Sequence, residues 1–178
     1  MDHQKLLQLA EQAGFEHSGE LNVEALVLRQ EVRDMCADNT CRRYGKCWSC
    51  PPACGSLEAI RRRIRKYTGG ILLQTTRTLR DDFDVKTMLR AEQIHKDRFR
   101  TLSRQARILY PDCLPMAAGS CTICQQCTYP DRPCRFPDRM FPSMEACGLV
   151  INDVCRDSGM PYDYGAGTIT YTSCILTC

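Results

Sequence analysis

Cysteine is the residue type with the clearest chemistry in this chain. There are 14 cysteines and only three histidines among 178 residues, far more cysteine than an average globular chain contains. Thiolates bind zinc and iron, and closely spaced cysteines in a reducing compartment are more often metal ligands than structural disulfides. The sequence therefore predicts metal chemistry in two cysteine-rich loops, at 36–54 and 113–142.

The second loop has the spacing of an iron-sulfur site. Cys121, Cys124 and Cys127 form Cys-x2-Cys-x2-Cys, and six residues separate this triplet from Cys134. Bacterial ferredoxins hold [4Fe-4S] clusters with the same triplet and a shorter last gap, but their fourth cysteine can ligate the other cluster, so Cys134 is a hypothetical fourth ligand. Zinc is the alternative cofactor, although two Cys-x2-Cys pairs are its usual ligands and one cysteine of the triplet would be surplus.

The first loop has enough thiols for a second metal centre. Its five cysteines are Cys36, Cys41, Cys47, Cys50 and Cys54. We prefer Cys36, Cys41 and Cys50 as ligands, with Cys54 as the fourth. Two alternatives stay open: Cys47 in place of Cys54, or three cysteines that leave one iron open to substrate. A structural zinc site is the competing interpretation of this loop.

Both loops carry a resemblance to a known family. The segments concerned are CADNTCRRYGKCWSCPPACG, DDFD, AAGSCTICQQCTYPDRPCRFP and SMEACGL. They are similar to an uncharacterised prokaryotic family of cysteine-rich predicted metal-binding proteins, a domain of unknown function. The resemblance implies metal ligation by Cys36, Cys41, Cys50, Cys121, Cys124, Cys127 and Cys134. Cys47 and Cys54 lie outside that pattern, and the resemblance implies no particular reaction.

The elements that position these loops are a mixture of helices and strands. Apolar residues at helical spacing predict helices over 2–13, 57–67, 85–110 and 143–154, and Ser56 and Ser143 are suited to cap two of them. Apolar and β-branched runs predict strands at 71–76 and 168–176, and 25–32 fits either type. We therefore expect a single α+β domain over 1–178, with a small mixed or antiparallel sheet packed against helices.

Charge and hydropathy limit the possible partners. The basic run at 61–66 is expected on an exposed helix face, and the net charge is only +3 without a base-stacking motif. This favours an acidic redox partner protein over nucleic acid. No apolar run is long enough to cross a membrane, and the absence of a signal-like N-terminus predicts a cytoplasmic location. His95 is expected to be a hydrogen-bonded core residue.

Three functional hypotheses follow from these residues. The first is an iron-sulfur protein with one or two [4Fe-4S] clusters and a role in redox chemistry or electron transfer. The second is an enzyme that uses a cluster with an open iron site. The third is a zinc-stabilised binding or regulatory protein.

Overall fold

A four-stranded antiparallel sheet forms the centre of the molecule. The computed structural model describes residues 3–178. The strands are β1 (His17–Glu20), β2 (Gly69–Thr78), β3 (Leu114–Met116) and β4 (Thr168–Thr177), in the order β1-β2-β4-β3. The two long strands, β2 and β4, pair along their whole length, from Gly69 opposite Thr177 to Thr78 opposite Thr168. The α+β class and the antiparallel sheet are confirmed.

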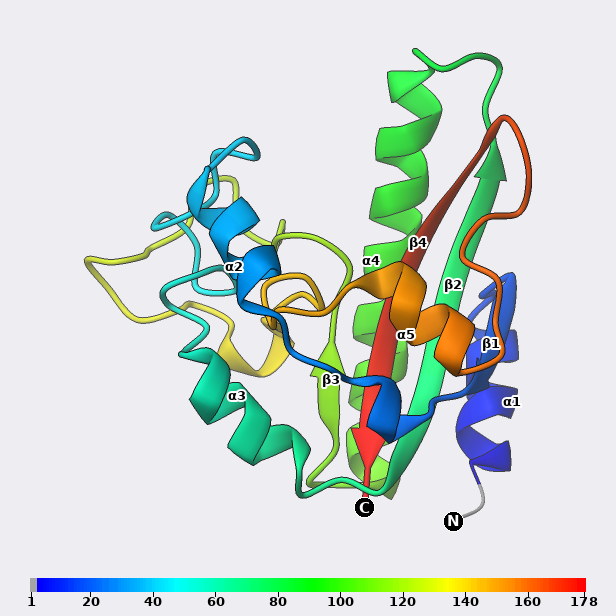
Figure 1. The fold of residues 1–178 in the computed structure, drawn as a ribbon, viewed down its shortest axis with the longest axis horizontal. Helices are drawn as coiled ribbons and strands as arrows, with labels where there is room; N and C mark the ends of the chain where they lie inside the picture. Colours follow the sequence, from blue (N-terminus) through cyan, green and yellow to red (C-terminus); the bar gives the residue numbers. More distant parts are fainter. Residues whose placement is uncertain (1–2) are drawn as a thin grey trace.

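Each face of the sheet is covered because successive strand residues point to opposite sides. On one face Ile71, Leu73 and Ile175 pack with side chains of α1 (Gln4–Gln12) and α4 (Val85–Leu109). On the other face Leu72 and its neighbours pack with α3 (Leu57–Ile64) and α5 (Ile151–Asp157). Figure 1 shows the long α4 behind the sheet and α5 in front of it. The core is therefore two apolar layers on either side of β2 and β4.

Local signals explain where the helices begin. The Ser56 hydroxyl accepts a hydrogen bond from the amide of Ala59 at the start of α3, and the Asp84 carboxylate accepts one from Thr87 at the start of α4. Such caps satisfy amides that have no partner within the helix. The expected helix 57–67 is real but ends at Ile64. Asp2, where the first expected helix starts, lies outside the described residues, and α1 itself confirms that helix.

Two expected elements differ from the structure. Segment 25–32 is neither a strand nor one helix: a 3-10 turn at Val23–Ala25 precedes α2, Gln30–Ala37. The expected helix 143–154 is divided because Gly148, at φ +89°, ends the turn that begins at Ser143, and α5 starts only at Ile151. A residue in this left-handed region cannot continue a right-handed helix.

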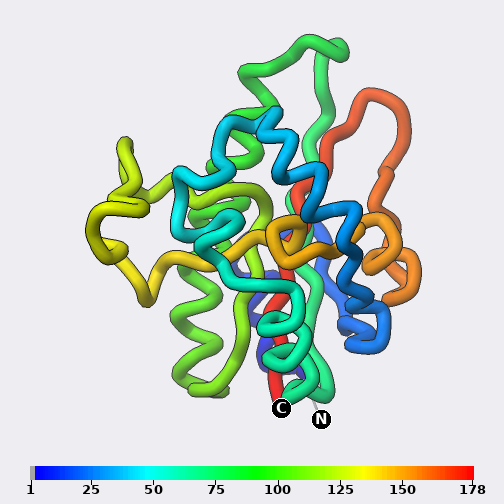
Figure 2. The backbone as a smooth tube through the Cα atoms, turned by 60° about the vertical axis from the view of Figure 1, so that its left-hand side comes forward, coloured from blue at the N-terminus to red at the C-terminus, as the bar shows by residue number. Residues whose placement is uncertain are grey.

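Both cysteine-rich loops lie beyond the β3 edge of the sheet, on the same side of the molecule (Figures 1 and 2). The first loop leaves the end of α2 and returns at α3, and the second connects β3 to the 3-10 turn η2 at Pro137–Arg139. β3 itself was expected to be loop. No helix among residues 3–178 has the length and hydropathy needed to span a membrane.

Candidate metal centre

The first-loop cysteines lie around the C-terminal end of α2. Cys36 is in the last turn of α2, Cys41 is exposed, Cys50 is buried and Cys54 is half-buried. The amide of Cys54 donates to the carbonyl oxygen of Cys50 at 3.1 Å. The largest effect on the pKa of Cys50, however, comes from Cys47, which is not one of these four preferred ligands.

Arg33 on α2 connects the first loop to the rest of the fold. Its guanidinium donates to the carbonyl oxygens of Ala146 at 2.7 Å and Gly55 at 3.0 Å. The same guanidinium lies 3.5 Å from the Cys54 sulfur. A cation this close favours the thiolate form of cysteine, so Arg33 partly compensates for the burial of Cys54.

Four of the second-loop cysteines line one pocket, and the fifth, Cys113, lies elsewhere. The wall of this pocket contains Cys121, Cys124, Cys127 and Cys134, and also Cys47 from the first loop. Apolar side chains close part of it, chiefly Trp48, Ile123, Phe136 and Met140, and two arginines, Arg43 and Arg135, complete the wall. Among the described lining residues the sulfur ligands come with no histidine, aspartate or glutamate. This donor set suits zinc or an iron-sulfur cluster rather than a hard cation.

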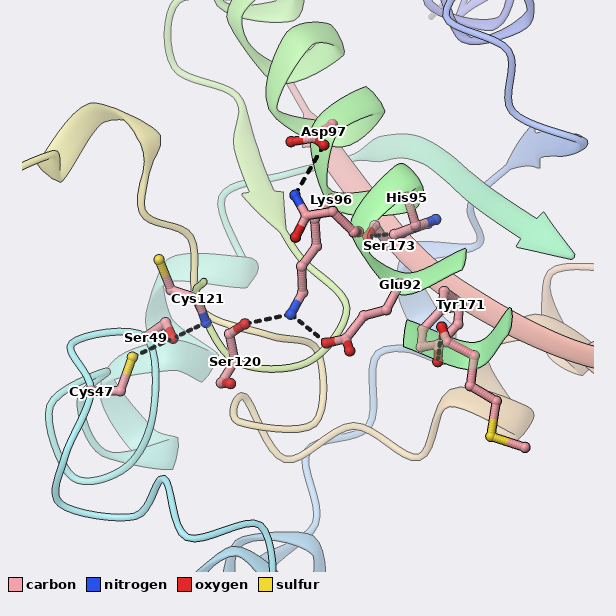
Figure 3. Close-up of polar contacts among 12 residues, drawn as sticks. Cys47, Ser49, Glu92, His95, Lys96, Asp97, Ser120, Cys121, Tyr171 and Ser173 are labelled. Atoms are coloured by element: carbon pink, nitrogen blue, oxygen red, sulfur yellow. Dashed lines mark hydrogen bonds and ion pairs between the residues drawn. The ribbon is translucent and has the colours of Figure 1, made fainter. Parts of the chain in front are cut away.

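Buried hydrogen bonds join the two loops at this pocket. The Ser49 hydroxyl, which is 0% exposed, accepts from the backbone amide of Cys121 at 2.9 Å. The same oxygen is 3.2 Å from the sulfur of Cys47 and 3.7 Å from that of Cys50. Nearby, the Trp48 indole donates to the carbonyl of Arg132 at 3.2 Å. Figure 3 shows Ser49 between Cys47 and Cys121.

The long helix α4 holds the start of the second loop from the opposite side. Lys96 is buried, and its ammonium donates to the carbonyl oxygen of Ser120 at 2.7 Å. Glu92, one turn earlier, forms an ion pair with the same ammonium. Figure 3 shows this contact beside the one made by Ser49. Buried charges are normally paired in this way because an unpaired one is costly.

Burial and hydrogen bonding shift the pKa values of the thiols in different directions. Burial raises the pKa of Cys36, Cys54 and Cys121 above the ordinary range. Hydrogen bonds from Cys50 and Ser49 lower the pKa of Cys47 to about 5, and the same contact raises that of Cys50. Hydrogen bonding thus favours the thiolate form of Cys47, whereas burial favours the protonated form of the other three, so metal binding by Cys36, Cys54 and Cys121 is accompanied by proton release.

Five cysteines line a common pocket, but the present positions of their sulfurs do not form a metal site. Among residues 3–178, no three histidine, cysteine, aspartate or glutamate side chains form a group that could hold a metal ion. Residues 118–136 form neither helix nor strand, so their thiols can move without breaking regular backbone pairing. The ligand assignments in both loops stay predictions.

Sequence reasoning missed the connection between the loops. Cys47 was treated as a substitute for Cys54, whereas the structure places it with the second-loop cysteines. The one sequence signal at Cys47, its Cys-x2-Cys spacing with Cys50, predicts that these two cysteines bind the same metal and does not indicate the second loop. A single lysine in a helix, such as Lys96, carries no comparable signal.

An α+β scaffold with two adjoining all-thiol loops defines a class of cysteine-rich domain suited to metal binding. Residues 19–177 match the family described as "Predicted metal-binding protein (DUF2284)". The chain belongs to this family, and the resemblance noted from the sequence is confirmed. Neither a curated protein nor a solved structure matches the chain.

Proposed function

We propose that this protein binds iron-sulfur clusters, one or two of the [4Fe-4S] type, and exchanges electrons with a partner protein. The observation that carries the proposal is the second-loop pocket, where Cys121, Cys124 and Cys127 are joined by Cys134 and Cys47 on one wall. A cluster of this type, when bound, supplies one-electron redox chemistry. All its protein ligands can come from the thiols of this wall.

The residues around the pocket would tune such a centre. The triplet provides three ligands, and either Cys134 or Cys47 provides the fourth. Trp48 lies edge-on to Tyr129, with ring centroids 4.9 Å apart, and this aromatic pair limits the access of water. Arg43 and Arg135 place positive charge beside a site that becomes negative when its thiols ionise. Burial and nearby cations are the means by which a protein sets a cluster potential.

The first loop would hold the second centre. Cys36, Cys41, Cys50 and Cys54 are its candidate ligands. The contact of Arg33 on α2 with the Cys54 sulfur, and the hydrogen bond from the Cys54 amide to the Cys50 carbonyl, support this grouping. Exposure of Cys41 favours a second candidate function, an enzyme in which this centre has only three firm ligands and an open iron that binds substrate. Zinc in a structural, binding or regulatory role remains the alternative cofactor for either loop.

The partner is proposed to be an acidic redox protein in the cytoplasm. Arg61 and Arg62 lie on the exposed side of α3. A second surface with net positive charge includes Arg139 of the second loop, in a groove that is also lined by Arg100, Arg104 and Arg107 of α4 and by two aspartates, Asp97 and Asp138. Complementary charge accelerates the association of redox partners. Nucleic acid is the less favoured partner.

Oxygen-free purification from iron-supplied cells tests the proposal. Iron, zinc and acid-labile sulfide are measured per chain, and the reduced protein is analysed by electron paramagnetic resonance. We expect brown protein in which iron and sulfide are equal, and loss of one cluster, four irons and four sulfides per chain, in Cys124→Ser. Cys178→Ser is the matched control, because Cys178 is exposed at the end of β4 and outside both loops. Colourless protein with stoichiometric zinc would refute the iron-sulfur proposal.

A further inference from the structure

Cys47 belongs to the first loop in sequence but to the second-loop pocket in space. Its side chain is 2% exposed, so it does not point to solvent as the neighbouring Cys41 does. It lines the pocket with the triplet of the second loop. Cys127, which lines the same pocket, lies 80 positions further along the chain. The fold has therefore brought this thiol to the second-loop site.

The backbone that carries the triplet is held against Cys47 from two sides. The peptide between Ser120 and Cys121 receives the Lys96 ammonium at its carbonyl oxygen, 2.7 Å away. Its amide donates to the Ser49 hydroxyl at 2.9 Å. Ser49 is only two residues from Cys47 and touches its sulfur at 3.2 Å. Figure 3 shows this order of contacts, from α4 through the peptide to the first loop.

Separating Cys47 from the triplet would be costly. If Cys121 moved away, the buried Ser49 hydroxyl would lose the amide hydrogen bond and the buried Lys96 ammonium would lose the Ser120 carbonyl. Ser49 would keep its contacts with the sulfurs of Cys47 and Cys50, and Lys96 would keep its ion pair with Glu92. Each would nevertheless lose its backbone partner in the second loop, and a buried group has little water to replace it. Cys134 is held only within its own loop, where the Thr128 hydroxyl donates to the Pro133 carbonyl at 2.9 Å and Arg135 donates to the Gln126 carbonyl at 2.9 Å. Its side chain is half-buried, whereas that of Cys47 is buried and contacts the residue that holds Cys121. The position of Cys47 next to the triplet is therefore the better determined of the two.

A ligand from a different loop has a chemical precedent. In two-cluster ferredoxins the cysteine triplet of one run shares its cluster with a cysteine from the other run. The chain between the two runs then closes around the centre, so that cofactor and fold stabilise each other. The arrangement of Cys47 with the 121–127 triplet reproduces this relation between two loops.

We propose that Cys47, and not Cys134, provides the fourth bond to the metal centre held by Cys121, Cys124 and Cys127. This inference rests on the proposed function. The two cysteine-rich loops then meet at one shared centre. Cys54 is left as the fourth candidate ligand of the first loop, beside Cys36, Cys41 and Cys50.

Single variants of the full chain test this assignment. Iron, zinc and sulfide per chain are measured in oxygen-free preparations of wild type, Cys47→Ser and Cys134→Ser, with Cys178→Ser as control. We expect Cys47→Ser to lose one cluster, four irons per chain, together with its paramagnetic signal after reduction. Cys134→Ser and the control should keep the wild-type content. Loss of the cluster in Cys134→Ser, or its retention in Cys47→Ser, would overturn the inference.

A labelling experiment on loaded wild type decides the matter if Cys47→Ser does not fold. The loaded protein is alkylated, then unfolded without its metal and treated with a second alkylating reagent, and the labelled peptides are identified by mass spectrometry. The same labelling is done on folded protein from which a chelator has removed the metal, because Cys47 is 2% exposed and burial alone slows its alkylation. We expect the first label on Cys134 in both preparations, and on Cys47 only in the metal-free protein. The opposite pattern, or the second label on both in the loaded protein, overturns the inference. Wild type that holds no metal at all refutes the proposed function itself, an outcome distinct from a wrong ligand.

Discussion

Replacement of His95 should change how the stability of this protein depends on pH. The imidazole is 0% exposed. Its Nδ1 lies 3.0 Å from the hydroxyl of Thr75 on β2, and its Nε2 lies 2.6 Å from that of Ser173 on β4. His95 thus joins α4 to the two central strands, one residue before the lysine that holds the second loop. The expectation of a hydrogen-bonded core histidine is confirmed.

The size of the effect follows from the pKa. Burial, helped by the positive charges of Arg98 and Lys96, lowers the pKa of His95 to about 3. The unfolded chain has a histidine pKa of about 6.5 and therefore binds the proton first as the pH falls. The stabilisation by neutral His95 is complete above about pH 6.5 and decreases towards pH 3. At pH 5 the loss is about 2 kcal/mol.

The assay compares wild type with His95→Gln, which keeps a polar side chain but does not titrate. Urea unfolding is followed by circular dichroism at pH 7.5 and 5.0, with reductant and chelator in both buffers. Wild type should be the more stable protein at pH 7.5, and this advantage should shrink by about 2 kcal/mol at pH 5.0. The Cys47 thiol, with its pKa lowered to about 5, adds a pH dependence of the same sign to both proteins, so it cancels. An advantage that changes by less than about 0.5 kcal/mol would show that His95 accepts a proton within the fold and would refute the reasoning.

Three further predictions concern the loops and the turn that supports them. Cys124→Ser should lower the melting temperature of the loaded protein relative to Cys178→Ser, because a metal bond contributes to folding; equal melting curves by calorimetry would contradict a structural role. Metal content after dialysis should fall as the pH is lowered from 8 to 5, because protons compete with the metal for thiols whose pKa is raised by burial. Constant metal content would argue against thiolate ligation. Gly148→Ala should cost about 1–3 kcal/mol in urea unfolding, because φ is +89° and the new methyl would meet a side-chain carbon of Leu57 at 2.6 Å. Gly159→Ala, also at positive φ but with open space around it, is the control and should cost clearly less.

Local sequence patterns predicted those elements that depend mainly on interactions between residues close together in the chain. The helix at 85–109 follows from apolar spacing and from the cap at Asp84, and β4 follows from alternating β-branched residues, because these signals act over a few neighbours. The separate cysteine groups were visible for the same reason. The prediction of one helix over 143–154 was wrong, because Gly148 has a left-handed backbone conformation that ends the first turn. The chain passes close to Leu57 of α3 at this position, and this contact is not visible in the local sequence.

The sequence by itself predicted metal binding from the number and spacing of the cysteines in two loops, and the α+β class from the apolar patterns of its helices and strands. Only the tertiary structure decided that the loops adjoin and that Cys47 faces the second one. That contact depends on α4 placing Lys96 against the Ser120 carbonyl, and on Ser49 reaching the amide of Cys121. Such partners are far apart in the chain, and their meeting depends on the packing of the whole sheet rather than on any local pattern.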